Sequence, residues 1–204
     1  IPRPSTVTIV EHVIGHAKAS GVEDDLLIAD VCTGSGCIAA ALAKRLPKSR
    51  VLASDVSAEA LAVASVNIAR HELSDRVELL IGDLLAPLIA HPAVAEGSET
   101  AGVRYLVSNP PYIPDDEWAT VEANVKDHEP TLALRGGGDG MQFVRPLLEQ
   151  GPTWVRSGGL LLVELASAKA DEGLDIVRKH PRVKSAEIAR DSDGLPRVVV
   201  AKVG

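Results

Sequence analysis

The sequence predicts an α/β fold in which a mostly parallel sheet is covered by helices on both faces. Short apolar runs of strand length alternate with helical patterns, and several of the runs end in a glycine or an acidic or polar residue. Such alternation is typical of parallel sheets, because a parallel connection needs a crossover that is usually a helix. In these folds the ligand site lies at the carboxyl ends of the strands.

The composition is that of one soluble, globular domain. Of 204 residues, 46% are hydrophobic and 24% are charged, a normal balance for a folded domain. The formal net charge of −7 disfavours broad binding to nucleic acid, which needs clustered Lys and Arg. Two cysteines, Cys32 and Cys37, are too few for a secreted disulfide framework and indicate an intracellular, reducing setting. No apolar run approaches the roughly 20 residues that cross a bilayer, and we expect neither a membrane partner nor a bound metal.

An amphipathic helix is predicted at the start of the chain. Gly21 can end it, and the apolar residues at near-helical spacing are Val7, Val10, Val13, Ile14 and Ala17. We expect residues 1–22 to form a helical segment that packs on a main domain spanning residues 23–204.

Strands and helices then alternate along the chain. The expected strands are 26–31, 51–54, 77–81, 103–108, 160–165, 183–189 and 197–203. The expected helices are 38–46, 58–71, 141–155 and 168–179, with Ser57 as the N-cap of the second. The last two strands are expected to pair as an antiparallel hairpin. Residues 86–102 and 114–139 read as irregular segments, and the second is expected to border a substrate site.

A glycine-rich loop follows the first expected strand, where backbone can approach a ligand closely. It consists of Cys32, Thr33, Gly34, Ser35 and Gly36. Residues 34–39 also fit the G-x-G-x-x-G/A pattern of dinucleotide-binding proteins, and Asp55 follows at roughly the ~20-residue distance of a ribose-binding acid. A nicotinamide-dependent enzyme is therefore one interpretation of the loop.

Three aspartates favour a different cofactor, S-adenosylmethionine, which carries ribose hydroxyls, an adenine amine and an ammonium group. Asp30 lies within the first strand, and Asp55 and Asp83 follow the next two. We expect Asp55 to accept hydrogen bonds from both ribose hydroxyls, and Asp83 with Leu84 to lie beside the adenine. The backbone of residues 32–36 would hold the methionine end. Each aspartate alone fits an ordinary turn or helix cap equally well, but their joint placement favours the cofactor.

The segment formed by Asn109, Pro110, Pro111 and Tyr112 ends the fourth expected strand and is the candidate substrate site. An amide nitrogen is a poor nucleophile, because its lone pair is delocalised into the carbonyl. The Asn109 side-chain oxygen and the Pro110 carbonyl can accept both N–H bonds of a primary amide and turn its nitrogen toward a methyl donor. Consecutive prolines fix φ and donate no N–H, and Tyr112 can stack on the amide or line the pocket. A simple strand-ending Asn-Pro turn is the plainer interpretation, which the upstream glycine loop disfavours.

Beyond this segment, the chain resembles the PrmC/HemK family of release-factor glutamine methyltransferases over nearly its whole length. The similarity is carried by residues 1–6 (Ile-Pro-Arg-Pro-Ser-Thr), 128–130 (His-Glu-Pro) and 133–140 (Ala-Leu-Arg-Gly-Gly-Gly-Asp-Gly). It implies a Rossmann-like class I S-adenosylmethionine-dependent methyltransferase with a seven-stranded sheet, in which residues 23–204 are the catalytic domain. It also implies N5-methylation of the glutamine in the Gly-Gly-Gln loop of a class 1 peptide release factor, with residues 109–112 gripping that glutamine and Asn109 also contacting the cofactor.

The chain departs from the family pattern at three positions. Cys32 stands where the D-x-G-x-G-x-G loop usually has its first glycine, and Ser5 and Val7 replace a common Asp and Glu. Cofactor binding is expected to survive Cys32 if its φ is ordinary, and no role follows for Ser5 and Val7. The loop and residues 193–198 look more like the mitochondrial branch, which slightly favours the mitochondrial matrix over the cytoplasm.

Two other functions remain open on the sequence. A methyltransferase for adenine N6 or another exocyclic amine would use the same acceptors on a flipped base, but the acidic charge and the lack of room for a target-recognition domain disfavour it. A noncatalytic scaffold for a translation partner is disfavoured by the intact Asn109, Asp55 and glycine loop.

Overall fold

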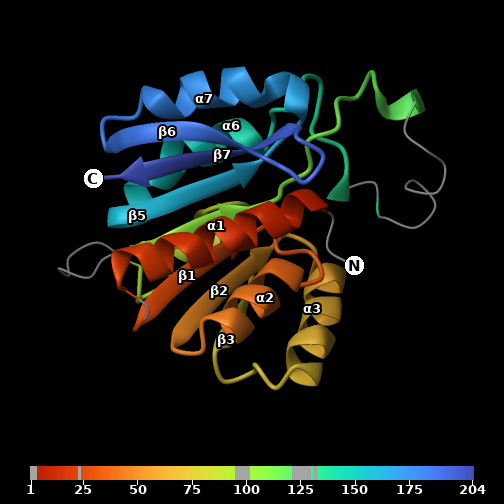
Figure 1. Cartoon of the computed structure of the whole chain (residues 1–204). Helices are drawn as coiled ribbons and strands as arrows, with labels where there is room; N and C mark the ends of the chain where they lie inside the picture. Colours follow the sequence, from red (N-terminus) through yellow and green to blue (C-terminus); the bar gives the residue numbers. More distant parts are fainter. Residues whose placement is uncertain (1–3, 23, 95–101, 121–129, 131–132) are drawn as a thin grey trace.

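The computed structural model describes residues 4–22, 24–94, 102–120, 130 and 133–204, and contains one seven-stranded sheet (Figure 1). Its strand order is β3-β2-β1-β4-β5-β7-β6. Strand β7 runs antiparallel to the other strands and lies between β5 and β6. The strands are β1 (Leu26–Val31), β2 (Ser49–Asp55), β3 (Val77–Ile81), β4 (Val103–Ser108), β5 (Val155–Glu164), β6 (Val183–Arg190) and β7 (Pro196–Val203). The predicted mostly parallel sheet with an antiparallel hairpin at its end is confirmed.

Helices cover both faces of the sheet. Residues of α1, α2 and α3 pack in one hydrophobic cluster, and residues of α4, α6 and α7 pack in the other. The helices are α1 (Pro4–Ser20), α2 (Cys37–Arg45), α3 (Ala58–Arg70), α4 (Ala86–Ile89), α6 (Val144–Gln150) and α7 (Ala170–Arg178), with 3-10 turns η1 (Trp118–Thr120), η3 (Gly151–Trp154) and η4 (Ser167–Lys169). Because successive side chains of a strand point to opposite faces, Ile28 lies in the first cluster and Leu27 and Ala29 in the second.

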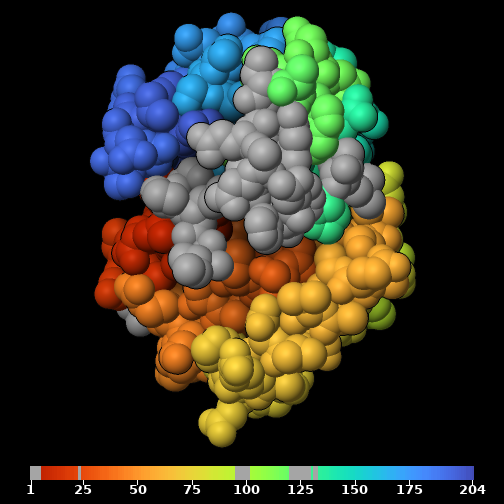
Figure 2. Space-filling model, turned by 90° about the vertical axis from the view of Figure 1, so that its right-hand side faces the viewer, coloured from red at the N-terminus to blue at the C-terminus, as the bar shows by residue number. Residues whose placement is uncertain are grey.

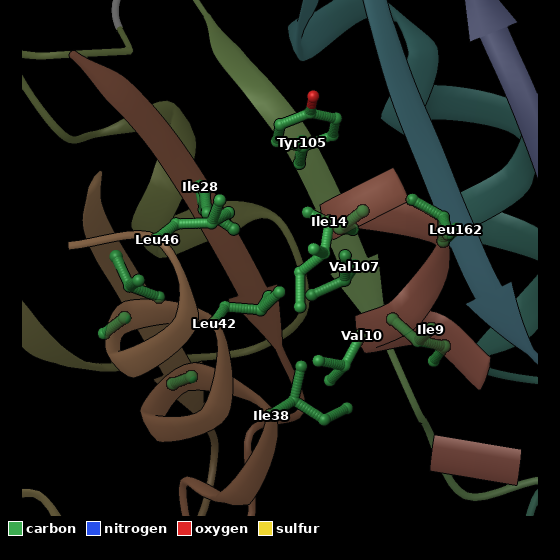
Figure 3. Close-up of a cluster of buried hydrophobic side chains, with 14 of the residues drawn as sticks. Ile9, Val10, Ile14, Ile28, Ile38, Leu42, Leu46, Tyr105, Val107 and Leu162 are labelled. Carbon is green, nitrogen blue, oxygen red and sulfur yellow. The ribbon is translucent and has the colours of Figure 1, made fainter. Parts of the chain in front are cut away.

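The first cluster joins α1 to the rest of the molecule. In Figure 3, Val10 and Ile14 of α1 lie toward Leu42 of α2 and Val107 of β4, and Ile9 belongs to the same cluster. Full burial of one such side chain stabilises a fold by roughly 1.5–3 kcal/mol. Helix α1 therefore shares the core of the sheet, and the proposed division at residue 22 remains a prediction.

One residue of the expected apolar stripe of α1 was placed wrongly. Val7 is 47% exposed, whereas Ile9, which the spacing did not select, is fully buried. Val7 lies three positions before Val10 and therefore fits helical spacing. The buried face nevertheless begins with Thr6 and Ile9, which lie four positions before Val10 and Val13, and Val7 lies at its exposed edge.

Near the fifth strand, two predicted element boundaries differ from those in the structure. The predicted helix 141–155 ends at Gln150, and a 3-10 turn that contains Pro152 takes its last residues. Strand β5 then begins at Val155, five residues before the expected start, and includes Gly158 with φ of +76°. The pairing of β5 with β4 shifts register between Val103 and Tyr105, as at a bulge.

Candidate active site

The candidate site lies where β1 and β4 end side by side in the centre of the sheet. Val31 and Ser108 are register partners, and the Ser108 hydroxyl donates to the Val31 carbonyl at 2.7 Å. Cys32 and Asn109, the next residues of the two strands, therefore leave the sheet next to each other. The chain continues from β1 to β2 on one side and from β4 to β5 on the other, which is the switch point where α/β sheets bind ligands.

Figure 2 shows the molecule from the side to which the parallel strands point. The orange and yellow segment that contains α2 and α3 forms the lower part of this face, and the green segment that follows β4 forms part of the upper rim. The expected cofactor loop and the expected substrate segment thus belong to opposite halves of one face.

Backbone hydrogen bonds shape the glycine loop. The Thr33 N–H donates to the Ser54 carbonyl at 2.9 Å, and the Gly34 N–H donates to Asp55 Oδ2 at 2.8 Å. Gly34 and Gly36 have φ of +54° and +76°. A Cβ on Gly36 would lie 3.0 Å from the Cβ of Ala64 on α3, whereas a Cβ on Gly34 would meet no atom within 4 Å. Gly36 thus permits close helix packing, and Gly34 borders open space.

Cys32 does not have the ordinary φ under which cofactor binding was expected to survive the loss of glycine. Its φ is +58°, in the left-handed region that favours glycine, and a non-glycine residue there costs roughly 1–2 kcal/mol. Burial, with a further contribution from the charge of Asp55, raises the pKa of the Cys32 thiol to about 12. Cys32 is thus a strained substitute for glycine, with a thiol that stays protonated at neutral pH.

Asp30 is fully buried beneath the loop. Its Oδ2 accepts hydrogen bonds from Thr33 Oγ1 at 2.6 Å and from the Ala39 N–H at 3.0 Å, while Oδ1 has no hydrogen-bond partner among the residues that the structure describes. Burial raises the pKa of Asp30 to about 7; the bonds from Thr33 and Ala39 oppose the rise, and the charge of Asp55 adds to it. A nearby cation would stabilise the ionised form of such a carboxyl group.

Asp55 and Asp83 lie at the ends of neighbouring strands. The Gly82 N–H donates to the Asp55 carbonyl at 3.0 Å, which joins the two strand ends. The Asp55 carboxylate accepts one bond on each oxygen, from the Gly34 N–H and from the Ser57 N–H at 3.0 Å. A carboxylate oxygen can accept two hydrogen bonds, so each retains one lone pair. Asp55 therefore has a structural role in the loop as well as capacity for a ligand.

The two residues after β3 differ in exposure. Asp83 is exposed, and the partly buried Leu84 has φ of +44° and packs against the second cluster. These residues stand beside the end of β2, as the cofactor hypothesis requires.

The segment of residues 109–112 is anchored at both ends by side chains far away in the sequence. Asn109 Nδ2 donates to Thr6 Oγ1 at 3.3 Å, and the Tyr112 hydroxyl donates to Glu164 Oε1 at 3.1 Å. Thr6, in the first turn of α1, is 4% exposed, and Glu164, at the end of β5, is fully buried. Pro110 between them is buried and Pro111 is partly buried. The sequence analysis missed Thr6 and Glu164, because no local pattern distinguishes them from ordinary core positions.

The glycine-rich stretch packs directly on the backbone of Tyr112. Ile113 and Arg135 form a parallel bridge, and the Gly136 N–H donates to the Ile113 carbonyl at 2.8 Å. A Cβ on Gly136 would lie 2.6 Å from the Tyr112 Cα, and one on Gly140 would lie 2.6 Å from the Tyr112 carbonyl oxygen. Gly136 and Gly140 are therefore required by their close contact with the Tyr112 backbone. Of the 128–130 motif, only Pro130 belongs to the described residues.

Two features are absent from residues 4–22, 24–94, 102–120, 130 and 133–204, which the structure describes. In that part of the chain, no helix is long and apolar enough to span a membrane, and no group of three or more His, Cys, Asp or Glu side chains is arranged to hold a metal ion.

Fold and site together define a class I methyltransferase domain. Residues 17–137 match the family described as Methyltransferase small domain. The fold is similar to that of the ribosomal protein L11 methylase from Lactobacillus delbrueckii subsp. bulgaricus, with a TM-score of 0.61 over 98% of this chain and 79% of that chain. The identity of 18% makes this a likeness of fold alone.

Within that class, the chain belongs to the release factor glutamine methyltransferase family. It is 42% identical over 176 residues to the release factor glutamine methyltransferase of Chlorobaculum tepidum, covering 84% of this chain and 57% of the relative. It is 37% identical to that of Clostridium acetobutylicum, covering 100% of this chain and 67% of the relative. The chain thus spans about three-fifths to two-thirds of the length of these relatives, and the predicted family membership is confirmed.

Proposed function

We propose that the protein uses S-adenosylmethionine to methylate the N5 atom of the glutamine in the Gly-Gly-Gln loop of a class 1 peptide release factor. The observation that carries the proposal is the pairing of Val31 with Ser108, which brings the loop that starts at Cys32 beside the segment that starts at Asn109. The names of the relatives, release factor glutamine methyltransferases, support the substrate.

The residues of the loop fit S-adenosylmethionine better than a nicotinamide cofactor. Asp30 is a buried carboxyl group with an oxygen that lacks a partner among the described residues, and it favours a ligand with ammonium and sulfonium charges. Asp55 retains acceptor capacity for ribose hydroxyls, and Asp83 with Leu84 stands at the next strand end, where the adenine would lie. The open space at Gly34 leaves room for the methionine end over residues 32–36.

Residues 109–112 would orient the glutamine amide. The Asn109 Oδ1 and the Pro110 carbonyl accept the two amide hydrogens, which points the nitrogen lone pair across the gap toward the loop. The Tyr112 hydroxyl is bonded to Glu164, and its ring would stack on the substrate amide or line the pocket around it. Bound S-adenosylmethionine supplies an electrophilic methyl group, and the protein contributes alignment and acceptor oxygens that hold the amide protons.

A methyl-transfer assay with labelled S-adenosylmethionine tests the proposal. Three acceptors are offered: a class 1 release factor, its Gln-to-Ala loop variant, and duplex DNA or tRNA. We expect label on the first alone. Label on nucleic acid but not on the release factor would establish an exocyclic-amine methyltransferase, and no label with any acceptor, despite cofactor binding, would favour a scaffold.

The setting of this reaction is part of the same proposal. Cys32 and Cys37 are free thiols, which supports a reducing environment such as the cytoplasm or the mitochondrial matrix.

A further inference from the structure

A hydrogen bond between the first helix and the substrate segment spans 103 positions of sequence. Asn109 Nδ2 donates to Thr6 Oγ1 at 3.3 Å. Thr6 is 4% exposed in the first turn of α1, and Asn109 is the first residue after β4. Helix α1 is itself fixed by Ile9, Val10 and Val13, which are buried in the first hydrophobic cluster. The Thr6 hydroxyl is therefore a rigidly placed partner.

The direction of this bond determines what Asn109 can offer a substrate. A carboxamide has an acceptor oxygen on one side and a donor NH2 group on the other, and a half-turn about χ2 exchanges them. With Nδ2 bonded to Thr6, Oδ1 is the atom left to accept a substrate N–H. In the reversed orientation, NH2 would face the NH2 group of a substrate amide, donor against donor.

We propose that Thr6 is a positioning residue for the methyl-transfer reaction: by accepting a hydrogen bond from Asn109 Nδ2, it keeps Asn109 Oδ1 turned toward the substrate amide. This inference rests on the proposed function. It gives a role to Thr6 of the N-terminal segment. The neighbouring Ser5 and Val7 have no role that follows from the sequence.

The bond also explains why a threonine suits this buried position. An apolar side chain would leave the partly buried Asn109 NH2 group without its acceptor, and the amide would turn to find another partner. Serine retains the hydroxyl, so Thr6→Ser should keep the orientation, whereas the similarly shaped Thr6→Val should lose it.

Steady-state kinetics with the release factor test the role of Thr6. For Thr6→Val we expect kcat/KM to fall by about tenfold, the scale of one lost orienting hydrogen bond. The dissociation constant for S-adenosylmethionine should stay unchanged, and Thr6→Ser should restore most of the rate. Thr8→Val, the same change two residues further along α1, is the matched control and should leave kcat/KM near wild type. Equal kcat/KM in Thr6→Val and wild type, or no rescue by serine, would overturn the proposal.

A second measurement tests the hydrogen bond between Asn109 and Thr6 without an activity assay. The chain has three asparagines and two glutamines, so few side-chain NH2 signals need assignment by NMR. The Asn109 signal is identified by its loss in Asn109→Ala, and Asn67, which donates to the Ser35 carbonyl at 3.0 Å, is an internal reference. We expect exchange of the Asn109 amide hydrogens with solvent to quicken in Thr6→Val but not in Thr6→Ser.

The two measurements test the proposed substrate and the role of Thr6 independently. If the wild-type protein transfers no label to the release factor, the proposed substrate is refuted. The NMR measurement still tests the hydrogen bond between Asn109 and Thr6. Exchange at Asn109 that is the same in all three proteins would refute the positioning role, whatever the substrate is.

Discussion

Replacing Asp30 with asparagine is expected to remove a pH-dependent destabilisation of the fold. Burial raises the pKa of Asp30 from 3.8 to about 7, against the opposing effect of hydrogen bonds from Thr33 and Ala39. The native state therefore holds the Asp30 proton more tightly than the unfolded chain does. Its stabilising contribution is complete below the unfolded pKa and is lost as the pH rises toward and through about 7.

The size of this effect follows from the shift. About three pKa units at about 1.36 kcal/mol each give on the order of 4 kcal/mol, of which roughly 2–3 kcal/mol falls between pH 5 and pH 8. Asparagine does not titrate and keeps an oxygen for Thr33 and Ala39. The stability of Asp30→Asn relative to wild type should therefore increase by about that amount across this range.

Urea unfolding of both proteins at several pH values measures the difference between their free energies of unfolding. The contributions of the carboxyl groups that the two proteins share cancel in this difference. A difference that stays constant with pH would show that Asp30 does not titrate in this range. A difference with the opposite slope would show a carboxylate stabilised in its charged form, which contradicts the argument from burial. Saturating S-adenosylmethionine should stabilise wild type more at pH 8 than at pH 5, since its positive charge favours ionised Asp30.

Three further outcomes follow from the site geometry. Gly140→Ala should destabilise the protein by about 1–3 kcal/mol in urea unfolding, because φ is +75° and the new Cβ would lie 2.6 Å from the Tyr112 carbonyl oxygen. Gly138→Ala is the control: its new Cβ would enter open space, so its stability should stay near that of wild type. Native Cys32, with a thiol pKa of about 12, should resist alkylation by iodoacetamide at pH 8 and react once urea unfolds the chain; rapid native alkylation would contradict that pKa. Tyr112→Phe should lower stability by about 1–3 kcal/mol, because the buried Glu164 carboxylate loses a donor, and unchanged unfolding would show that this bond contributes little.

Much of the sheet could be predicted from the sequence because its strands are short apolar runs with clear ends. The bounds of β1, β3 and β4 match the expected residues 26–31, 77–81 and 103–108. Ser57 also caps α3 as expected, with its hydroxyl accepting from the Ala60 N–H at 3.1 Å. In these places local chemistry and tertiary packing agree.

The misses lie where packing overrides local pattern. The start of β5 at Val155 depends on pairing with Val103 of β4, which the glycines at 158 and 159 conceal in the sequence. The four-residue helix α4 lies in a segment expected to be loop, since one turn of helix has no detectable periodicity. The left-handed backbone of Cys32 has no local signal, because a cysteine normally avoids it.

The residues of the candidate site likewise fall into those that the sequence could select and those that it could not. The loop of residues 32–36, Asp55 and the 109–112 segment could be selected in advance because residue type and strand position both pointed to them. Thr6 and Glu164 could not, because each acts through a partner at least 52 positions away. Only the folded chain brings them to the segment they hold.

The division of the site between cofactor and substrate is tested most directly by comparing Asn109→Ala with Asp55→Ala. The two readouts are S-adenosylmethionine affinity by calorimetry and methyl transfer to the release factor. We expect Asn109→Ala to abolish transfer while cofactor affinity stays within about twofold of wild type. We expect Asp55→Ala to weaken cofactor binding first, by about tenfold or more, because the variant loses the ribose acceptors and the bond from the Gly34 N–H. Equal loss of cofactor binding in both variants would contradict the division of the site into a cofactor loop and a substrate clamp.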